Sequence, residues 1–77
     1  MRTVNPELVT ERREQILIAA ARCFRERGFH GASIKNICGA ADLSPGLLYH
    51  YFRNKEEIID VIIERELDHI MGIVSKV

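Results

Sequence analysis

The side chains best suited to chemistry in this chain are a hydroxyl and two lysines at the expected starts of helices. Ser33 and Lys35 lie at the N-terminal end of a short helix expected over 34–41. Free backbone amides, the helix dipole and a lysine together suit a phosphate oxygen at such a position. Lys55 repeats the combination at the start of a later helix. The pattern indicates phosphate binding, with a plain helix cap beside a solvated lysine as the alternative.

A second candidate surface is one face of a short helix expected over 45–52, with Ser44 as its N-cap and Pro45 as its first helical residue. The core needs Leu48, Tyr51 and Phe52, which leaves the opposite face exposed. The members of that face are Ser44, Pro45, Gly46, Leu47, Tyr49 and His50. It has no Arg, Asn or Gln to make bidentate contacts with base edges. If DNA is the partner, as a pair of short helices joined by a tight turn would indicate, recognition would depend on the tyrosine and histidine, on contacts with thymine methyls and on DNA deformability.

Two positions on this face have more specific expected roles. Gly46 would let the protein backbone approach DNA closely. Tyr49 would contact a thymine methyl or donate its hydroxyl to a phosphate, and the alternative is an aromatic side chain that merely lies on a helix surface.

No grouping of side chains is typical of catalysis or metal binding. His30, His50 and His69 have no mutual spacing that suggests metal ligation, and no Ser, His and acid combination indicates a nucleophile. Cys23 and Cys38 lack metal-ligand spacing and are interpreted as small core residues rather than a disulfide. We therefore expect a protein that is not an enzyme and needs no metal or other cofactor.

Length and composition indicate one small folded domain or a fragment of a longer protein. The chain has 77 residues, of which 47% are hydrophobic and 29% charged, with two Pro and five Gly. Its longest apolar stretch, residues 16–21, is far shorter than the roughly 18 to 20 residues that cross a bilayer. Residues 1–10 do not resemble a signal peptide. We expect a cytoplasmic protein with no membrane partner.

Charge is distributed unevenly although the formal net charge is zero. Residues 1–55 carry nine Lys or Arg and five acids, a balance of +4, whereas residues 56–77 carry two bases and six acids, a balance of −4. A basic part followed by an acidic part would let one end of the molecule approach a polyanion. Ordinary scatter of charges is the alternative.

Hydrophobic periodicity predicts an all-α fold. The first helix is expected over about 10–27 with an apolar face that includes Ile16, and Gly28 supplies its stop. It begins either at Pro6 with Asn5 as cap or after Thr10. Further helices are expected over 34–41, 45–52 and 54–77.

The two short helices and the turn between them match a helix-turn-helix unit. This unit presents a short helix to the major groove of DNA and is clamped here by flanking helices. We divide the chain into a flexible arm over 1–9, a three-helix DNA-binding domain over 10–53, and a fourth helix over 54–77. In that last helix Asn54 and Glu57 are expected to form a capping box.

The run Leu-Leu-Tyr-His-Tyr-Phe-Arg-Asn-Lys-Glu-Glu over 47–57 resembles the N-terminal DNA-binding domain of the TetR family of transcriptional regulators. The resemblance covers roughly residues 12–62. It implies that Lys35 can also reach a base edge and favours a phosphate contact for Tyr49. The chain departs from the family pattern at Cys38, where Ala is usual, and at Asp42, where Gly is usual.

The fourth helix is longer than a three-helix DNA-binding core needs. It spans about 24 residues, near 36 Å, and carries an apolar stripe of Leu67, Ile70, Met71 and Val74 that nothing in the chain would cover. The resemblance implies a missing C-terminal domain that binds an unknown small-molecule effector and forms a homodimer. Effector binding would tilt the fourth helix and change the spacing of the two recognition helices on a palindromic operator.

The resulting prediction is a sequence-specific DNA-binding repressor of the TetR type, of which this chain is the DNA-binding head. One alternative is a helical protein-interaction module that docks through the fourth helix. Another is a stand-alone helix-turn-helix protein that dimerises through that helix.

Overall fold

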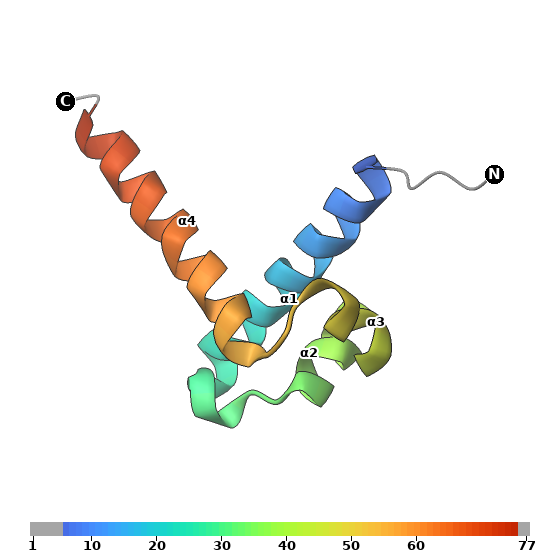
Figure 1. Cartoon of the computed structure of the whole chain (residues 1–77). Helices are drawn as coiled ribbons and strands as arrows, with labels where there is room; N and C mark the ends of the chain where they lie inside the picture. Colours follow the sequence, from blue (N-terminus) through green and yellow to red (C-terminus); the bar gives the residue numbers. More distant parts are fainter. Residues whose placement is uncertain (1–5, 76–77) are drawn as a thin grey trace.

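The computed structural model describes the backbone of residues 6–75 and the side chains of residues 10–69, and this part contains four α-helices and no strand. The helices are α1 (Pro6–Gly31), α2 (Ile34–Ala41), α3 (Pro45–Tyr51) and α4 (Lys55–Ser75). Figure 1 shows α1 and α4 diverging as the two arms of a V, with α2 and α3 packed together beside the lower part of α1. The all-α fold class predicted from the sequence is confirmed.

The largest difference from the expected helix bounds is in α1. It begins at Pro6, so residues 6–9 are helical rather than a flexible arm, and this agrees with the proline alternative. Asn5 and the other residues of 1–5 lie outside the described residues. At the other end Gly28 interrupts the helix with φ 76° and ψ 166°, a conformation that favours glycine. One further helical turn follows and ends at Gly31, and in it Gly28 O accepts a hydrogen bond from Ala32 N at 3.0 Å.

The shorter helices lie close to the expected ranges. α2 occupies Ile34–Ala41, and α3 ends at Tyr51, where Phe52 takes an extended conformation as the C-cap. α4 begins at Lys55 and is described to Ser75, so residues 76–77 lie outside the described part.

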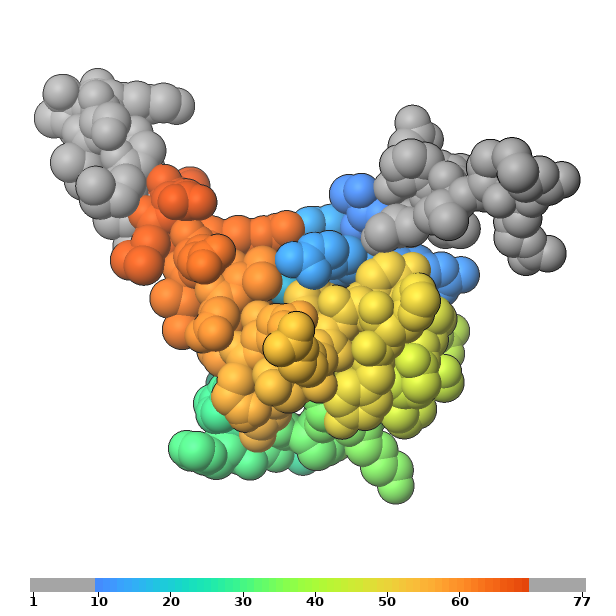
Figure 2. Space-filling view, viewed as in Figure 1, coloured from blue at the N-terminus to red at the C-terminus, as the bar shows by residue number. Residues whose placement is uncertain are grey.

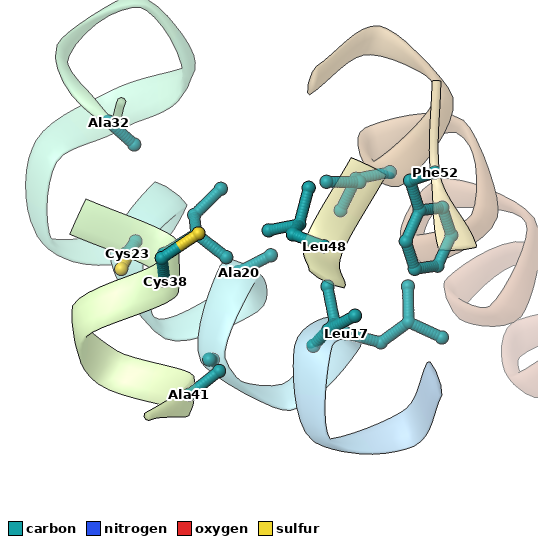
Figure 3. Packing of buried hydrophobic residues seen from close by; sticks show 12 residues of the cluster. Leu17, Ala20, Cys23, Ala32, Cys38, Ala41, Leu48 and Phe52 are labelled. Carbon is teal, nitrogen blue, oxygen red and sulfur yellow. The ribbon is translucent and has the colours of Figure 1, made fainter. Parts of the chain in front are cut away.

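Small side chains let α1 and α2 pack closely. Ala19, Ala20 and Cys23 are buried on α1, and Cys38 and Ala41 are buried on α2. Figure 3 shows Ala20, Cys23, Cys38 and Ala41 between the two helices, and Ala32 from the connection between them belongs to the same core cluster. Close approach of two short helices needs such small residues because interiors are packed without voids.

Larger side chains join α3 and α4 to the same core. Leu48 of α3 and Phe52 at its end are 0% and 1% exposed, and in Figure 3 both face Leu17 of α1. Ile58 of α4 is 0% exposed in the same cluster. The α1 guanidinium of Arg13 lies over the Phe52 ring, 4.6 Å from its centroid, which adds a cation–π contact.

The apolar side chains of α4 differ in burial. Ile58 is fully buried, whereas Ile63 and Leu67 are about half exposed, and for Leu67 this agrees with the stripe expected to be uncovered. Ile59 and Ile62 are half-buried. The side chains of Ile70, Met71 and Val74, the rest of the stripe expected to be uncovered, lie outside those described. No helix in the described part of the chain is both long and apolar enough to span a membrane.

One ion pair crosses the open side of the V. Both guanidinium nitrogens of Arg65 on α4 donate to the carboxylate of Glu14 on α1, at 2.8 and 2.5 Å. This charge-assisted, bidentate bond holds the pKa of Glu14 below its ordinary value. This ion pair links α1 and α4 in addition to the core contact of Ile58, about ten residues along α4 from its start.

Candidate nucleic-acid interface

The turn between α2 and α3 consists of the three residues 42–44, a length typical of a helix-turn-helix. Asp42 follows α2 in the left-handed conformation, with φ 57° and ψ 47°, and its N–H donates to Cys38 O. Leu43 N donates to the same carbonyl at 3.0 Å. Aspartate tolerates this region better than most residues, which explains how it stands where glycine is usual in the resembling family. The two short helices therefore meet across a tight turn.

Ser44 begins α3 as the N-cap. Its hydroxyl oxygen accepts a hydrogen bond from Leu47 N at 3.2 Å, and Pro45 follows in the first turn of the helix. Both roles were predicted from the sequence and are confirmed.

The outward face of α3 is exposed. Five of the six residues predicted for it are exposed, and Leu47 is half-buried; the exposed five are Ser44, Pro45, Gly46, Tyr49 and His50. The Tyr49 side chain is 51% exposed, while Leu48 on the opposite side is fully buried. In Figure 2 the segment that contains α3 forms part of the surface turned toward the viewer.

Gly46 has open space around it. A Cβ built on Gly46 would meet nothing closer than Ser44 Oγ, at 4.0 Å. Internal packing therefore does not require glycine at this position, and a close approach by another molecule remains a reason for it.

The N-terminus of α2 is capped and still has free amides. Ser33 Oγ accepts from Asn36 N at 3.0 Å, and Asn36 Oδ1 accepts from Ser33 N at 3.0 Å, so the two form a reciprocal capping box. Within the described residues, the N–H groups of Ile34 and Lys35 have no hydrogen-bond partner, and the Lys35 side chain is exposed. Two free amides and a cation at a helix start suit an anionic oxygen.

Lys55 is placed differently from the other predicted phosphate ligands. Its Nζ donates to Phe29 O at 2.6 Å and to Ala32 O at 3.0 Å, and it lies 4.4 Å from the centroid of the Phe29 ring. Two of the three ammonium protons are thus used within the protein, which leaves one for a phosphate. No sequence signal predicts this contact, because the acceptors are backbone carbonyls 23 and 26 residues away.

The expected capping box at the start of α4 is offset by one residue. Asn54 Oδ1 accepts from Glu57 N at 2.8 Å as predicted, but the Glu57 carboxylate accepts from Arg53 N at 3.2 Å rather than from Asn54 N. The same carboxylate pairs with the guanidinium of Arg53 at 4.0 Å. Arg53 remains 86% exposed, beside the end of α3.

Gln15 is a residue near this interface that the sequence analysis did not single out. Its Nε2 donates to Ala41 O, the last residue of α2, at 2.6 Å. Gln15 lies next to the buried Ile16 on α1, and its type alone carries no signal for this role.

Among the described residues no group of three or more His, Cys, Asp or Glu side chains could hold a metal ion.

Comparison with known proteins agrees with this architecture. The profile of a family described as bacterial regulatory proteins, tetR family, matches residues 16–62, which is more than half of the chain. The chain belongs to the tetR family. The matched segment includes the helix-turn-helix unit and the start of α4, the regions that carried the resemblance in the sequence. No solved structure matches the chain.

Several curated relatives in this family are similar over most of the chain. The HTH-type transcriptional regulator UidR of Escherichia coli is 46% identical over 60 residues, covering 78% of this chain and 31% of the relative. The HTH-type transcriptional repressor KstR2 of Rhodococcus jostii is 39% identical, covering 79% and 30%. The HTH-type transcriptional activator FasR of Mycolicibacterium smegmatis is 38% identical, covering 80% and 28%. The chain thus spans less than a third of the length of these relatives. Their names describe transcriptional regulators, so they do not favour the alternative of a protein-interaction module that docks through the fourth helix.

Proposed function

We propose that this chain is the DNA-binding head of a sequence-specific transcriptional regulator. The observation that carries the proposal is the exposed face of α3, held by a tight left-handed turn against α2, with an unencumbered glycine in its first turn. In this arrangement α3 enters the major groove and the start of α2 lies against the phosphate backbone.

Each predicted contact has a role in this proposal. The free amides at the start of α2, with Ser33 and Lys35, bind a phosphate, and Lys35 extends to a base edge. The remaining ammonium proton of Lys55 is available to a second phosphate. The rest of the surface lies on α3 and its cap: Ser44, Pro45, Gly46, Leu47, Tyr49 and His50.

This surface predicts modest specificity for each half-site. Bidentate contacts between a side chain and a base account for about 1–3 kcal/mol of discrimination each, and α3 offers no Arg, Asn or Gln to make them. Tyr49 and His50 provide single contacts, and Leu47 provides an apolar surface for a thymine methyl. Recognition of a full operator therefore depends on two heads bound at a fixed spacing.

The whole protein is proposed to be a homodimer on a palindromic operator. A C-terminal domain outside this chain would supply the dimer contacts and the small-molecule effector site, and α4 would link that domain to the head. We infer a cytoplasmic, non-enzymatic protein. We propose repression, as named for KstR2, although the relatives also include a protein named as an activator.

A pair of glycine substitutions tests the interface directly. Gly46→Ala places a methyl group on the proposed DNA face without an internal clash. Gly39→Ala is the control, because it adds a methyl group on α2, outside the proposed contacts, where nothing lies within 4 Å. Both variants should keep the wild-type fold. We expect Gly46→Ala to weaken binding to a duplex selected from a random pool by about tenfold, in line with the energy of one base contact, and Gly39→Ala to leave it unchanged.

The readout is fluorescence anisotropy with the labelled duplex, supported by thermal melts of both variants. Equal affinities for a folded Gly46→Ala variant and the wild type would remove α3 from the interface. Loss of affinity in Gly39→Ala of the same size would move the interface onto α2.

A further inference from the structure

Side chains from other helices hold α2 at both of its ends. Lys55 of α4 donates to the carbonyl of Ala32, directly before the N-cap Ser33. Gln15 of α1 donates to the carbonyl of Ala41, the last residue of α2. Both bonds therefore fix backbone that leads into a proposed DNA-contacting helix start.

We propose that Gln15 and Lys55 are positioning residues that set the orientation of the helix-turn-helix unit relative to α1 and α4. The effect on DNA affinity rests on the proposed function, whereas the effect on α2 does not. In Lys55 two ammonium protons serve this internal role, and the third is the one proposed above for a phosphate.

The contacts of Lys55 favour an internal role. Its Nζ donates to both Phe29 O and Ala32 O and lies over the Phe29 ring, so three groups of the α1–α2 connection surround one ammonium. A cation is favourable there because these carbonyls follow the interruption of α1 and have no helix partners of their own. Lys35, with no partner among the described side chains, has no such commitment.

Gln15 acts at the opposite end, where the chain reverses. Ala41 is followed at once by Asp42 in the left-handed conformation and by the bond between Leu43 N and Cys38 O that closes the turn. The Gln15 amide ties this turn to α1 by a short bond of 2.6 Å. The direction of α3 is set within the next three residues, so a displacement of Ala41 would be carried to Ser44.

Amide hydrogen exchange on the 77-residue chain tests the two ends separately. We expect Lys55→Met to speed exchange of the Ile37 amide, which donates to Ser33 O, by about tenfold relative to the Phe52 amide. We expect Gln15→Leu to act on the Leu43 amide by about three- to tenfold and to leave Ile37 unchanged relative to Phe52. Lys55→Arg, which keeps a donor, should restore most of the protection at Ile37.

Lys35→Met is the matched control for charge, since it removes the same group close to the same helix end. It should leave the exchange of Ile37 unaltered. Uniform acceleration at Ile37, Leu43 and Phe52 in the Lys55 and Gln15 variants would show only a loss of global stability and would overturn the proposal. No acceleration at any of them would also overturn it.

Binding to the selected duplex then tests the consequence for DNA. Gln15→Leu should lower affinity by about tenfold while leaving the dependence on salt unchanged, and Lys55→Met should lower affinity by at least as much. If Lys55→Met lowers the salt slope by about one but leaves the exchange of Ile37 unchanged, Lys55 is a phosphate ligand only and its positioning role is contradicted. Unchanged affinity in both variants would contradict the link between α2 and DNA. Failure of the wild type to bind any duplex would count against the proposed function alone, because the exchange measurements would still decide whether α2 is held.

Discussion

Replacing Phe52 with alanine removes the largest fully buried side chain of the described core. Phe52 is 1% exposed, ends α3 as its C-cap, and shares the core cluster with residues of all four helices. Its ring also lies under the guanidinium of Arg13. The substitution therefore leaves a cavity at the point where the proposed recognition helix joins the rest of the domain.

The expected cost is large relative to the stability of so small a domain. Truncating a buried phenylalanine to alanine costs about 3–5 kcal/mol, which combines the lost transfer energy with the cavity left behind. At about 0.05–0.15 kcal/mol per residue, 77 residues give a total free energy of unfolding of about 4–12 kcal/mol. We expect Phe52→Ala to be unfolded, or to melt with much of its stability lost.

Urea unfolding followed by circular dichroism measures this cost, and Tyr49→Ala is the matched control. Tyr49 is an aromatic on the same helix, but it is 51% exposed, so its truncation should change the free energy of unfolding by no more than about 0.5 kcal/mol. A Phe52→Ala variant with an unfolding free energy within about 1 kcal/mol of the wild type, at an unchanged slope, would refute the placement of Phe52 in the core.

Three further predictions follow from the turn, the ion pair and the cysteines. Asp42→Gly should raise the free energy of unfolding by up to about 1 kcal/mol in urea melts, because glycine has no penalty in the left-handed conformation; a loss would show that the aspartate side chain stabilises the turn. Arg65→Gln should cost about 0.2–1 kcal/mol at neutral pH. Since Arg65 lowers the pKa of Glu14 from its ordinary 4.5, this stabilisation is complete above pH 4.5 and is lost as the pH falls below it. Melts of the wild type and of Arg65→Gln at several pH values measure the stabilisation. A stability difference between the two proteins that is the same at every pH would contradict this prediction. Cys23 and Cys38 are buried and burial raises the pKa of Cys38, so a thiol reagent should label the native chain at least about tenfold more slowly than the urea-unfolded chain, and equal rates would contradict this burial.

Local signals in the sequence predicted much of the fold. Ser33, Ser44 and Pro45 are strong start signals, and α2 and α3 begin where these residues place them. The buried positions Leu48 and Phe52 follow from helical periodicity combined with the need for a core. Such features depend on residues within a few positions of one another, so they can be recognised without the tertiary structure.

Contacts between distant segments could not be predicted in this way. The bonds of Lys55 to the α1–α2 connection and of Gln15 to Ala41 depend on how the helices pack, and their acceptors are backbone carbonyls that have no sequence signature. The burial of Ile58, while Ile63 stays about half exposed, likewise depends on how α4 packs against the other helices.

Selection of bound duplexes from a random-sequence pool, repeated across a salt series, tests the central claim most directly. The account predicts that the folded 77-residue chain retains duplex DNA with an affinity that falls as salt rises, and that the retained sequences share a half-site or a palindrome of two half-sites. A folded chain that retains no duplex in a salt-sensitive manner would contradict it.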